Sequence, residues 1–287
     1  MNTLIKKSWF PYLALSIGMF CIGISPIFTR LAAISGPVIA FYRTLIAVII
    51  LIPIWLSKSN AKYDKTGILL AMLAGAFFAF DIAMWNVSLF HTLAATSTLL
   101  ANLAPVWVGF GTLYILREKL RNNYWKGLFI TFIGVFIILG LKNIQHFDIG
   151  LGNLLAIGAS IFYAGYLLVT QKSRTRIDTI SFTTIVVISC SVILFILCLL
   201  LNENMTKISH QSWTYIIALG VISHAGGWLS INYALGHIKA SVASVTLLGQ
   251  PVIAAILAMF ILDEWLNFWQ IIGGIIVLVG IYLVNKK

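Results

Sequence analysis

The chain has 287 residues, 60% of them hydrophobic and 9% charged, and it carries a formal net charge of +11. A soluble domain typically carries about 25% charged residues. This composition excludes an ordinary soluble protein and indicates a membrane protein with very little mass outside the bilayer.

Apolar segments recur along the whole chain, each with the roughly 20 residues needed to cross about 30 Å of hydrocarbon. The bilayer interior offers no water to backbone amides, so only helices or closed barrels span it. Barrel strands would alternate polar and apolar residues, and these segments do not. The sequence therefore predicts an all-α integral membrane protein with ten transmembrane helices, at 10–33, 37–57, 66–89, 94–116, 123–141, 150–170, 180–201, 212–234, 240–262 and 267–285.

The basic residues follow a pattern when these helices are threaded through a membrane with the N-terminus inside. Fifteen lysines and arginines then fall on the cytoplasmic side and three on the outside, while Arg43 lies within a helix. Basic loops remain in the cytoplasm, so we expect both termini and the loop 117–121 there, and Asp263 and Glu264 outside. The net charge is therefore a topology signal and a contact for anionic lipid, and we expect no nucleic-acid partner.

A constant offset of 146 residues aligns the two halves of the chain without a gap. HTLAATSTLLANLAPVWVGFGTLYILREKL, from His91, aligns with HIKASVASVTLLGQPVIAAILAMFILDEWL, from His237. Each half, 1–144 and 145–287, holds five predicted helices, so the second half would cross the membrane in the opposite sense. Inverted repeats place a substrate site near the midplane and suit alternating access. The alignment also pairs polar residues, prolines and glycines, namely Asn86 with Asn232, Pro105 with Pro251, Glu118 with Glu264, Gly127 with Gly273 and Gly134 with Gly280.

The segments NLAPVWVGFGTLYILREKL and GLFITFIGVFIILG resemble the helices of the EamA repeat, and so do GQPVIAAILAMFILDEWL and QIIGGIIVLVGIYLV. The shared pattern is a central proline, a glutamate at the loop and then a glycine-rich helix. Two such units in ten helices are typical of the drug/metabolite transporter superfamily. The resemblance implies a secondary transporter, most often an exporter of small metabolites from the bacterial cytoplasm. The helix pair 150–201 matches less well, because it has no equivalent of Arg43.

Few polar residues fall deep inside the predicted helices. Asp81 is the only carboxylate in a helix interior and His224 the only deep histidine, and each is followed four residues later by a tryptophan, Trp85 and Trp228. Residues i and i+4 share a helix face, and the offset of 146 maps His224 one turn from Asp81. Because ionisable groups inside a membrane are costly, we expect these residues to line a central substrate site, with Arg43 as an ion-pair or gating residue.

Structural interpretations of the same residues stay open. Asp81 could pair with Arg43 and hold two helices together, His224 could form an interhelical hydrogen bond, and Trp85 and Trp228 could face lipid.

Other candidates for substrate binding come from helix breaks and from aromatic residues. Asn102 and Gln250 each lie within one turn of a proline, which frees a backbone carbonyl in the preceding turn and can line a cavity. Tyr163 and Tyr166 lie on one predicted helix and complete the set, although helical aromatics more often pack in a core.

Motifs of membrane enzymes are absent from the sequence. An intramembrane aspartyl protease needs two membrane carboxylates, a rhomboid-like enzyme needs Gly-x-Ser-Gly, and a membrane zinc protease needs His-Glu-x-x-His. The three cysteines, Cys21, Cys190 and Cys198, show no metal-ligand spacing with histidines. We therefore expect no enzyme, no cofactor and no metal.

The sequence and the resemblance together favour a carrier in the bacterial inner membrane, either a monomer or a homodimer. Its solute would be an amino acid or a related amphipathic metabolite, because one acid and several aromatics suit an amino group. A lipid-linked carrier flippase and a nucleoside-type uptake or exchange carrier of the same superfamily are the alternatives.

Overall fold

The computed structural model describes residues 9–57, 64–88, 91–92, 94–139, 150–261 and 265–286, and these residues form helices and connecting turns with no strand among them. The helices are α1 (Phe10–Gly23), α2 (Ser25–Ala32), α3 (Gly36–Leu56), α4 (Lys65–Ser88), α5 (Ala94–Ala101), α6 (Ala104–Tyr114), α7 (Asn122–Leu139), α8 (Leu151–Arg174), α9 (Thr179–Leu200), α10 (His210–Ala218), the π-helix η2 (Leu219–Gly227), α11 (Trp228–Leu235), α12 (Ala240–Leu247), α13 (Gln250–Ile261) and α14 (Phe268–Asn285).

Nine helical stretches within these described ranges are long and apolar enough to cross a membrane. They coincide with nine of the ten predicted segments and confirm an all-helical, multi-pass membrane protein. The remaining segment, predicted at 94–116, forms the two short helices α5 and α6, which are separated at Asn102 and Leu103. This stretch carries the polar residues Thr96, Ser97, Thr98 and Asn102.

The break between α5 and α6 has a counterpart between α12 and α13. An offset of 146 carries Ala94–Ala101 onto Ala240–Leu247, and the start of α6 onto the start of α13. Each break precedes a proline, Pro105 or Pro251, which has no N–H to bond the carbonyl four residues earlier. The repeated sequence thus forms the same local structure twice.

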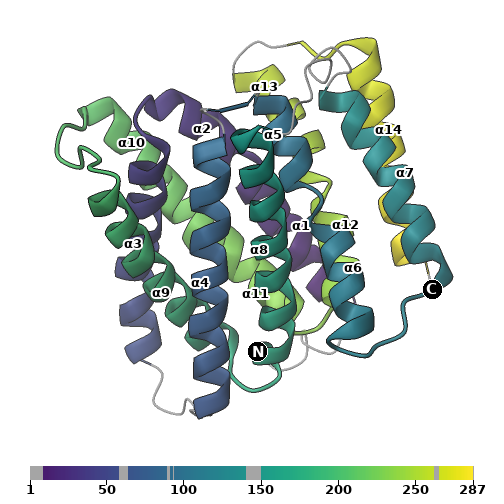
Figure 1. Cartoon of the computed structure of the whole chain (residues 1–287), viewed down its shortest axis with the longest axis horizontal. Helices are drawn as coiled ribbons and strands as arrows, with labels where there is room; N and C mark the ends of the chain where they lie inside the picture. Colours follow the sequence, from purple (N-terminus) through teal and green to yellow (C-terminus); the bar gives the residue numbers. More distant parts are fainter. Residues whose placement is uncertain are drawn as a thin grey trace.

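Helices α7 and α14 lie side by side (Figure 1) and approach through glycines. A Cβ added at Gly127 would lie 2.7 Å from the carbonyl oxygen of Gly280, and one added at Gly134 would lie 2.6 Å from that of Gly273. Residue 127 meets residue 280, and residue 134 meets residue 273. Residue numbers therefore rise along one helix and fall along the other, so the two helices run antiparallel. Small residues at such crossings let backbones meet closely.

We expect Gly134→Ala to destabilise the protein by about 1–3 kcal/mol, the range seen when a well-packed core is overfilled. The new methyl group would meet backbone atoms, the Gly273 oxygen and the Val277 nitrogen, each at 2.6 Å. Gly274→Ala is the matched control, since its Cβ would meet only Val252 Cγ1 at 3.5 Å. Thermal melting of both variants in detergent tests this, and equal melting temperatures would contradict it.

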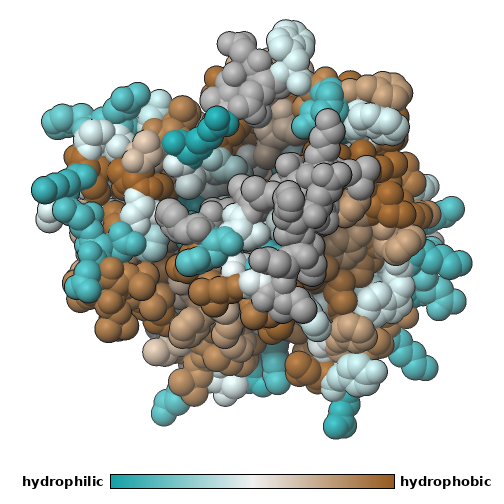
Figure 2. All heavy atoms as spheres, turned by 45° about the horizontal axis from the view of Figure 1, so that its top comes forward, coloured by the Kyte–Doolittle hydropathy of each residue, from teal (hydrophilic) through white to brown (hydrophobic). Residues whose placement is uncertain are grey.

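The outer surface is largely apolar, as expected of a membrane protein. Figure 2 shows broad hydrophobic areas on the face in view, with hydrophilic residues mostly near its margins. Large apolar side chains such as Leu69, Phe129 and Ile275 are exposed on different helices. Continuous apolar surface of this extent indicates contact with lipid.

Candidate functional site

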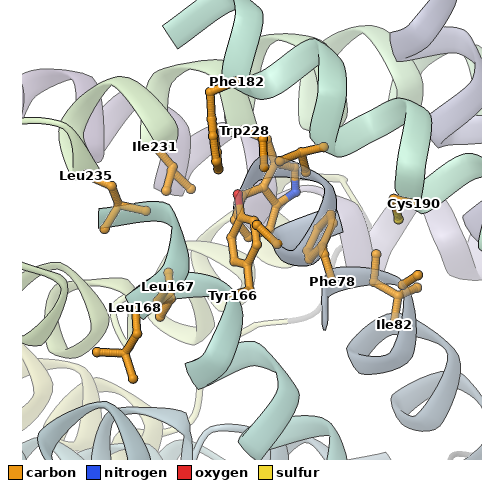
Figure 3. Packing of buried hydrophobic residues seen from close by; sticks show 14 of the residues in the cluster. Phe78, Ile82, Tyr166, Leu167, Leu168, Phe182, Cys190, Trp228, Ile231 and Leu235 are labelled. Atoms are coloured by element: carbon orange, nitrogen blue, oxygen red, sulfur yellow. The ribbon is translucent and has the colours of Figure 1, made fainter. Parts of the chain in front are cut away.

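Three aromatic side chains from three helices meet at the centre of the bundle (Figure 3). Phe78 of α4 stacks on Tyr166 of α8, with ring centroids 4.9 Å apart, and meets the edge of Trp228 of α11 at 4.5 Å. Phe78 is 3% exposed and Trp228 is 7% exposed. Trp228 therefore faces the protein interior, and its lipid-facing interpretation is wrong.

Tyr163 extends this aromatic cluster of Phe78, Tyr166 and Trp228. Its ring is parallel to that of Tyr166 at 6.2 Å and meets Trp228 edge-on at 6.1 Å. Tyr163 is only half-buried, and the side chain of Gln250 lies beside its hydroxyl. The predicted residues Tyr163, Tyr166, Trp228 and Gln250 are thus brought together.

The hydroxyl of Tyr166 begins a chain of hydrogen bonds to residues outside the predicted site. It donates to Asn232 Oδ1 at 2.6 Å, and Asn232 Nδ2 donates to Thr183 Oγ1 at 3.2 Å. Asn232 is one of the residues shared between the two halves, which is the signal that could have identified it. Phe78 carried a weaker signal, because the offset of 146 residues makes it the equivalent of His224 but the residue type is not shared.

Asp81 lies on α4 one turn after Phe78 and is half-buried. No ion pair or hydrogen bond joins its carboxylate to another described residue. Arg43 instead donates from Nη1 to Ser25 Oγ at 3.1 Å. Arg43, Tyr163 and Tyr166 lie within electrostatic range of Asp81. The direct Arg43–Asp81 ion pair is therefore not formed in this structure.

His224 lies on η2, where the equivalent stretch of α4 is an ordinary α-helix. Its ring is 5.8 Å from that of Phe78, it is 1% exposed, and neither ring nitrogen has a hydrogen-bond partner among the described residues. The predicted interhelical hydrogen bond is therefore not made there. Short π-helices within α-helices occur frequently at functional sites.

Two of the predicted site residues lie apart from the aromatic cluster. Trp85 is half-buried on α4 and makes none of the ring contacts described above, and Asn102 is half-buried at the break between α5 and α6. The i and i+4 spacing of Asp81 and Trp85 places them on one helix face. The residue of α4 that contacts Tyr166 and Trp228 is nevertheless Phe78 and not Trp85.

A separate cleft of about 510 Å³ lies between α1, α9 and α11. Its lining includes Leu13, Ile17, Arg174, Asp178 and Tyr233. It contains none of the predicted site residues, and Leu13 and Ile17 of α1 are exposed. We place the candidate solute site at the aromatic cluster, because Asp81 lies one turn from Phe78 and the His224 ring, whose nitrogens have no partner among the described residues, lies beside it.

Residues 9–140 and 150–286 each match the profile of the EamA-like transporter family. An "Uncharacterized transporter" of Archaeoglobus fulgidus is 24% identical over 255 residues, 87% of both chains. "Uncharacterized transporter YwfM" of Bacillus subtilis is 23% identical over 273 residues, 94% of this chain and 91% of that one. A solved structure described as "Crystal structure of protein" has a TM-score of 0.81 at 15% identity, covers 96% of this chain and supports the fold alone. The chain therefore belongs to the EamA-like transporter family and is a multi-pass membrane transporter.

Proposed function

We propose that this protein is a secondary carrier of the bacterial inner membrane that exports an amino acid or a related amphipathic solute. The observation that carries the proposal is Asp81, a half-buried carboxylate without a bonded partner among the described residues, close to the aromatic cluster. A carboxylate beside aromatic rings can bind an ammonium group by charge-assisted hydrogen bonds and cation–π contacts.

The position of this site supports transport by alternating access. Phe78 and Asp81 belong to the first half of the chain, whereas Tyr166 and Trp228 belong to the second, so the site is shared by the two halves. In our proposal the halves are inverted five-helix repeats within ten helices, and the antiparallel packing of α7 against α14 supports this. Rocking of one half against the other would open the site to each side in turn.

The proposed orientation places both termini in the cytoplasm. Three contacts between predicted cytoplasmic segments support a shared face. They are the ion pair of Glu118 with Lys239 at 2.6 Å, that of Arg176 with Asp64 at 3.0 Å, and the hydrogen bond from Arg121 Nη1 to the Lys286 carbonyl at 3.4 Å. The predicted outer residues Asp263 and Glu264 lie outside the described residues.

Cysteine labelling tests this orientation. In a cysteine-free background, Lys119→Cys should resist an impermeant maleimide in intact cells and react after permeabilisation, because residue 119 is exposed on the side that the basic loops keep inside. Lys207→Cys is the matched control and should react in intact cells. Labelling of residue 119 from outside would refute the orientation.

Transport assays test the proposed function itself. Inverted membrane vesicles containing the carrier should accumulate labelled amino acids or related amines above the level in vesicles from a deletion strain. Accumulation restricted to strongly anionic solutes would contradict a site built around Asp81. Movement only in the opposite direction would contradict export while leaving the carrier assignment intact.

A lipid-linked carrier flippase is the second candidate, and the cleft beside α1 is the observation that favours it. A flippase needs an opening towards the bilayer, and this cleft is bordered by the exposed Leu13 and Ile17 and also contains Arg174. Competition by a lipid-linked phosphate, without competition by amino acids, would favour this function over the export of a small solute.

A further inference from the structure

Three buried polar atoms near the aromatic cluster have no hydrogen-bond partner among the described residues. They are Nε of Arg43 and both ring nitrogens of His224. The two residues lie on neighbouring helices, because η2 packs closely on α3: a Cβ added at Gly220 would be 3.2 Å from the carbonyl oxygen of Arg43. The charge of Arg43 also acts on His224. Buried polar groups are normally satisfied, so an unpaired group needs an explanation.

Arg43 is the most costly of these groups. A guanidinium has five N–H donors, and the hydrogen bond to the neutral Ser25 hydroxyl is the one described here. No carboxylate lies within ion-pair distance of it in the described ranges. A cation at this depth is tolerated when it faces a partner or a wet cavity. Its fork of donors matches the geometry of a carboxylate.

We propose that Arg43, together with Ser25 and His224, forms an anion subsite that binds the carboxylate of the solute while Asp81 binds its amino group. This inference rests on the proposed function and deepens it, because it makes the carrier selective for a zwitterion over an amine. Arg43 bonds Ser25 rather than Asp81, so the guanidinium and the carboxylate are not bonded to each other. A zwitterion placed between them would satisfy both.

The experiment compares two solutes that differ only in the carboxylate, phenylalanine and phenethylamine, in vesicles reconstituted with the purified carrier. The wild-type protein should prefer phenylalanine by about 10- to 100-fold in apparent affinity, the range expected for a hydrogen bond to a charged group. Arg43→Gln should remove this preference by weakening phenylalanine transport while leaving phenethylamine transport within about twofold. Arg30→Gln, the same change at an exposed residue of α2, is the matched control.

A second variant keeps the test decisive if Arg43→Gln is poorly folded. His224→Phe introduces the residue that occupies the equivalent position, Phe78, in the first half. Like Arg43→Gln, it should reduce the preference for phenylalanine over phenethylamine. A monodisperse elution profile in detergent would show that the variant is folded. Inorganic phosphate is added as a competitor in each assay. Inhibition of phenylalanine transport by phosphate, stronger than that by phenethylamine, would overturn the assignment to a carboxylate.

The outcomes separate the subsite from the proposed function. Equal transport of both solutes by the wild-type protein would overturn the subsite and leave an amine carrier in place. If both Arg43→Gln and His224→Phe keep the wild-type preference for phenylalanine over phenethylamine, the subsite is overturned. The unpaired nitrogens of Arg43 and His224 would then be hydrogen-bonded to bound water instead of the solute. Transport of neither solute would overturn both the subsite and the proposed function.

Discussion

Asp81→Asn is expected to abolish solute transport while membrane insertion and thermal stability remain close to those of the wild-type protein. The amide has nearly the same shape as the carboxylate but cannot attract an ammonium group. The carboxylate has no hydrogen bond or ion pair with the described residues, so the substitution breaks no such contact. The measurements are transport in reconstituted vesicles and thermal melting in detergent.

The contrasting result would identify a structural ion pair. If Asp81 neutralised Arg43, the Asn variant would leave a buried charge unpaired, which costs about 3–5 kcal/mol. The melting temperature would then fall, and adding Arg43→Gln would restore it. Wild-type transport by Asp81→Asn would rule out a role in binding.

Asp64→Asn is the matched control for Asp81→Asn. Asp64 lies outside the membrane-spanning helices and pairs with Arg176 at 3.0 Å. The hydrogen bond from Arg176 holds the pKa of the Asp64 carboxyl below its ordinary value, so this residue is ionised at neutral pH. An exposed ion pair contributes little to the free energy of unfolding. We therefore expect the stability of this variant to change little and its transport to be unchanged.

Trp228→Ala is expected to destabilise the protein by about 3–5 kcal/mol, the range measured for truncating a buried tryptophan or phenylalanine, and to abolish transport. The indole contacts Phe78 and Tyr166 at centroid distances of 4.5 and 5.3 Å. Its removal would open a cavity where α4, α8 and α11 meet. Trp228→Phe should retain part of both properties because an aromatic ring remains.

Trp265→Ala provides the comparison for this second prediction. Trp265 is 81% exposed, so its truncation leaves no cavity and should change the melting temperature little. Melting of both alanine variants and transport by both are measured side by side. Equal melting temperatures for the two would contradict a structural role for Trp228, and normal transport by Trp228→Ala would contradict an aromatic binding surface.

The sequence anticipated the helices much better than the contacts between their side chains. The predicted segments 123–141 and 267–285 differ by at most two residues from α7 and α14 at each end. In the site, Tyr163, Tyr166, Trp228 and Gln250 are together as predicted, and Asp81 is within electrostatic range of the two tyrosines. Trp85 and Asn102 are not in the aromatic cluster.

Helix formation and the contacts between side chains depend on different physical factors. Length, apolar composition and the need to satisfy backbone hydrogen bonds in lipid determine by themselves that these segments are helices. The offset of 146 residues likewise determines that the breaks before Pro105 and Pro251 recur. The partner of a side chain depends instead on how each helix is rotated about its axis, and packing against neighbouring helices sets that rotation.

Only the tertiary structure therefore decided that Arg43 bonds Ser25 rather than Asp81. It also decided that Phe78 is central to the cluster and that the second half forms η2 where the first half keeps an α-helix. In a π-helix the hydrogen bonds span one more residue than in an α-helix, which changes the angular spacing of side chains such as His224 and Trp228. The backbone hydrogen bonding around His224 therefore differs from that around its equivalent, Phe78, although the repeated sequence aligns the two halves without a gap.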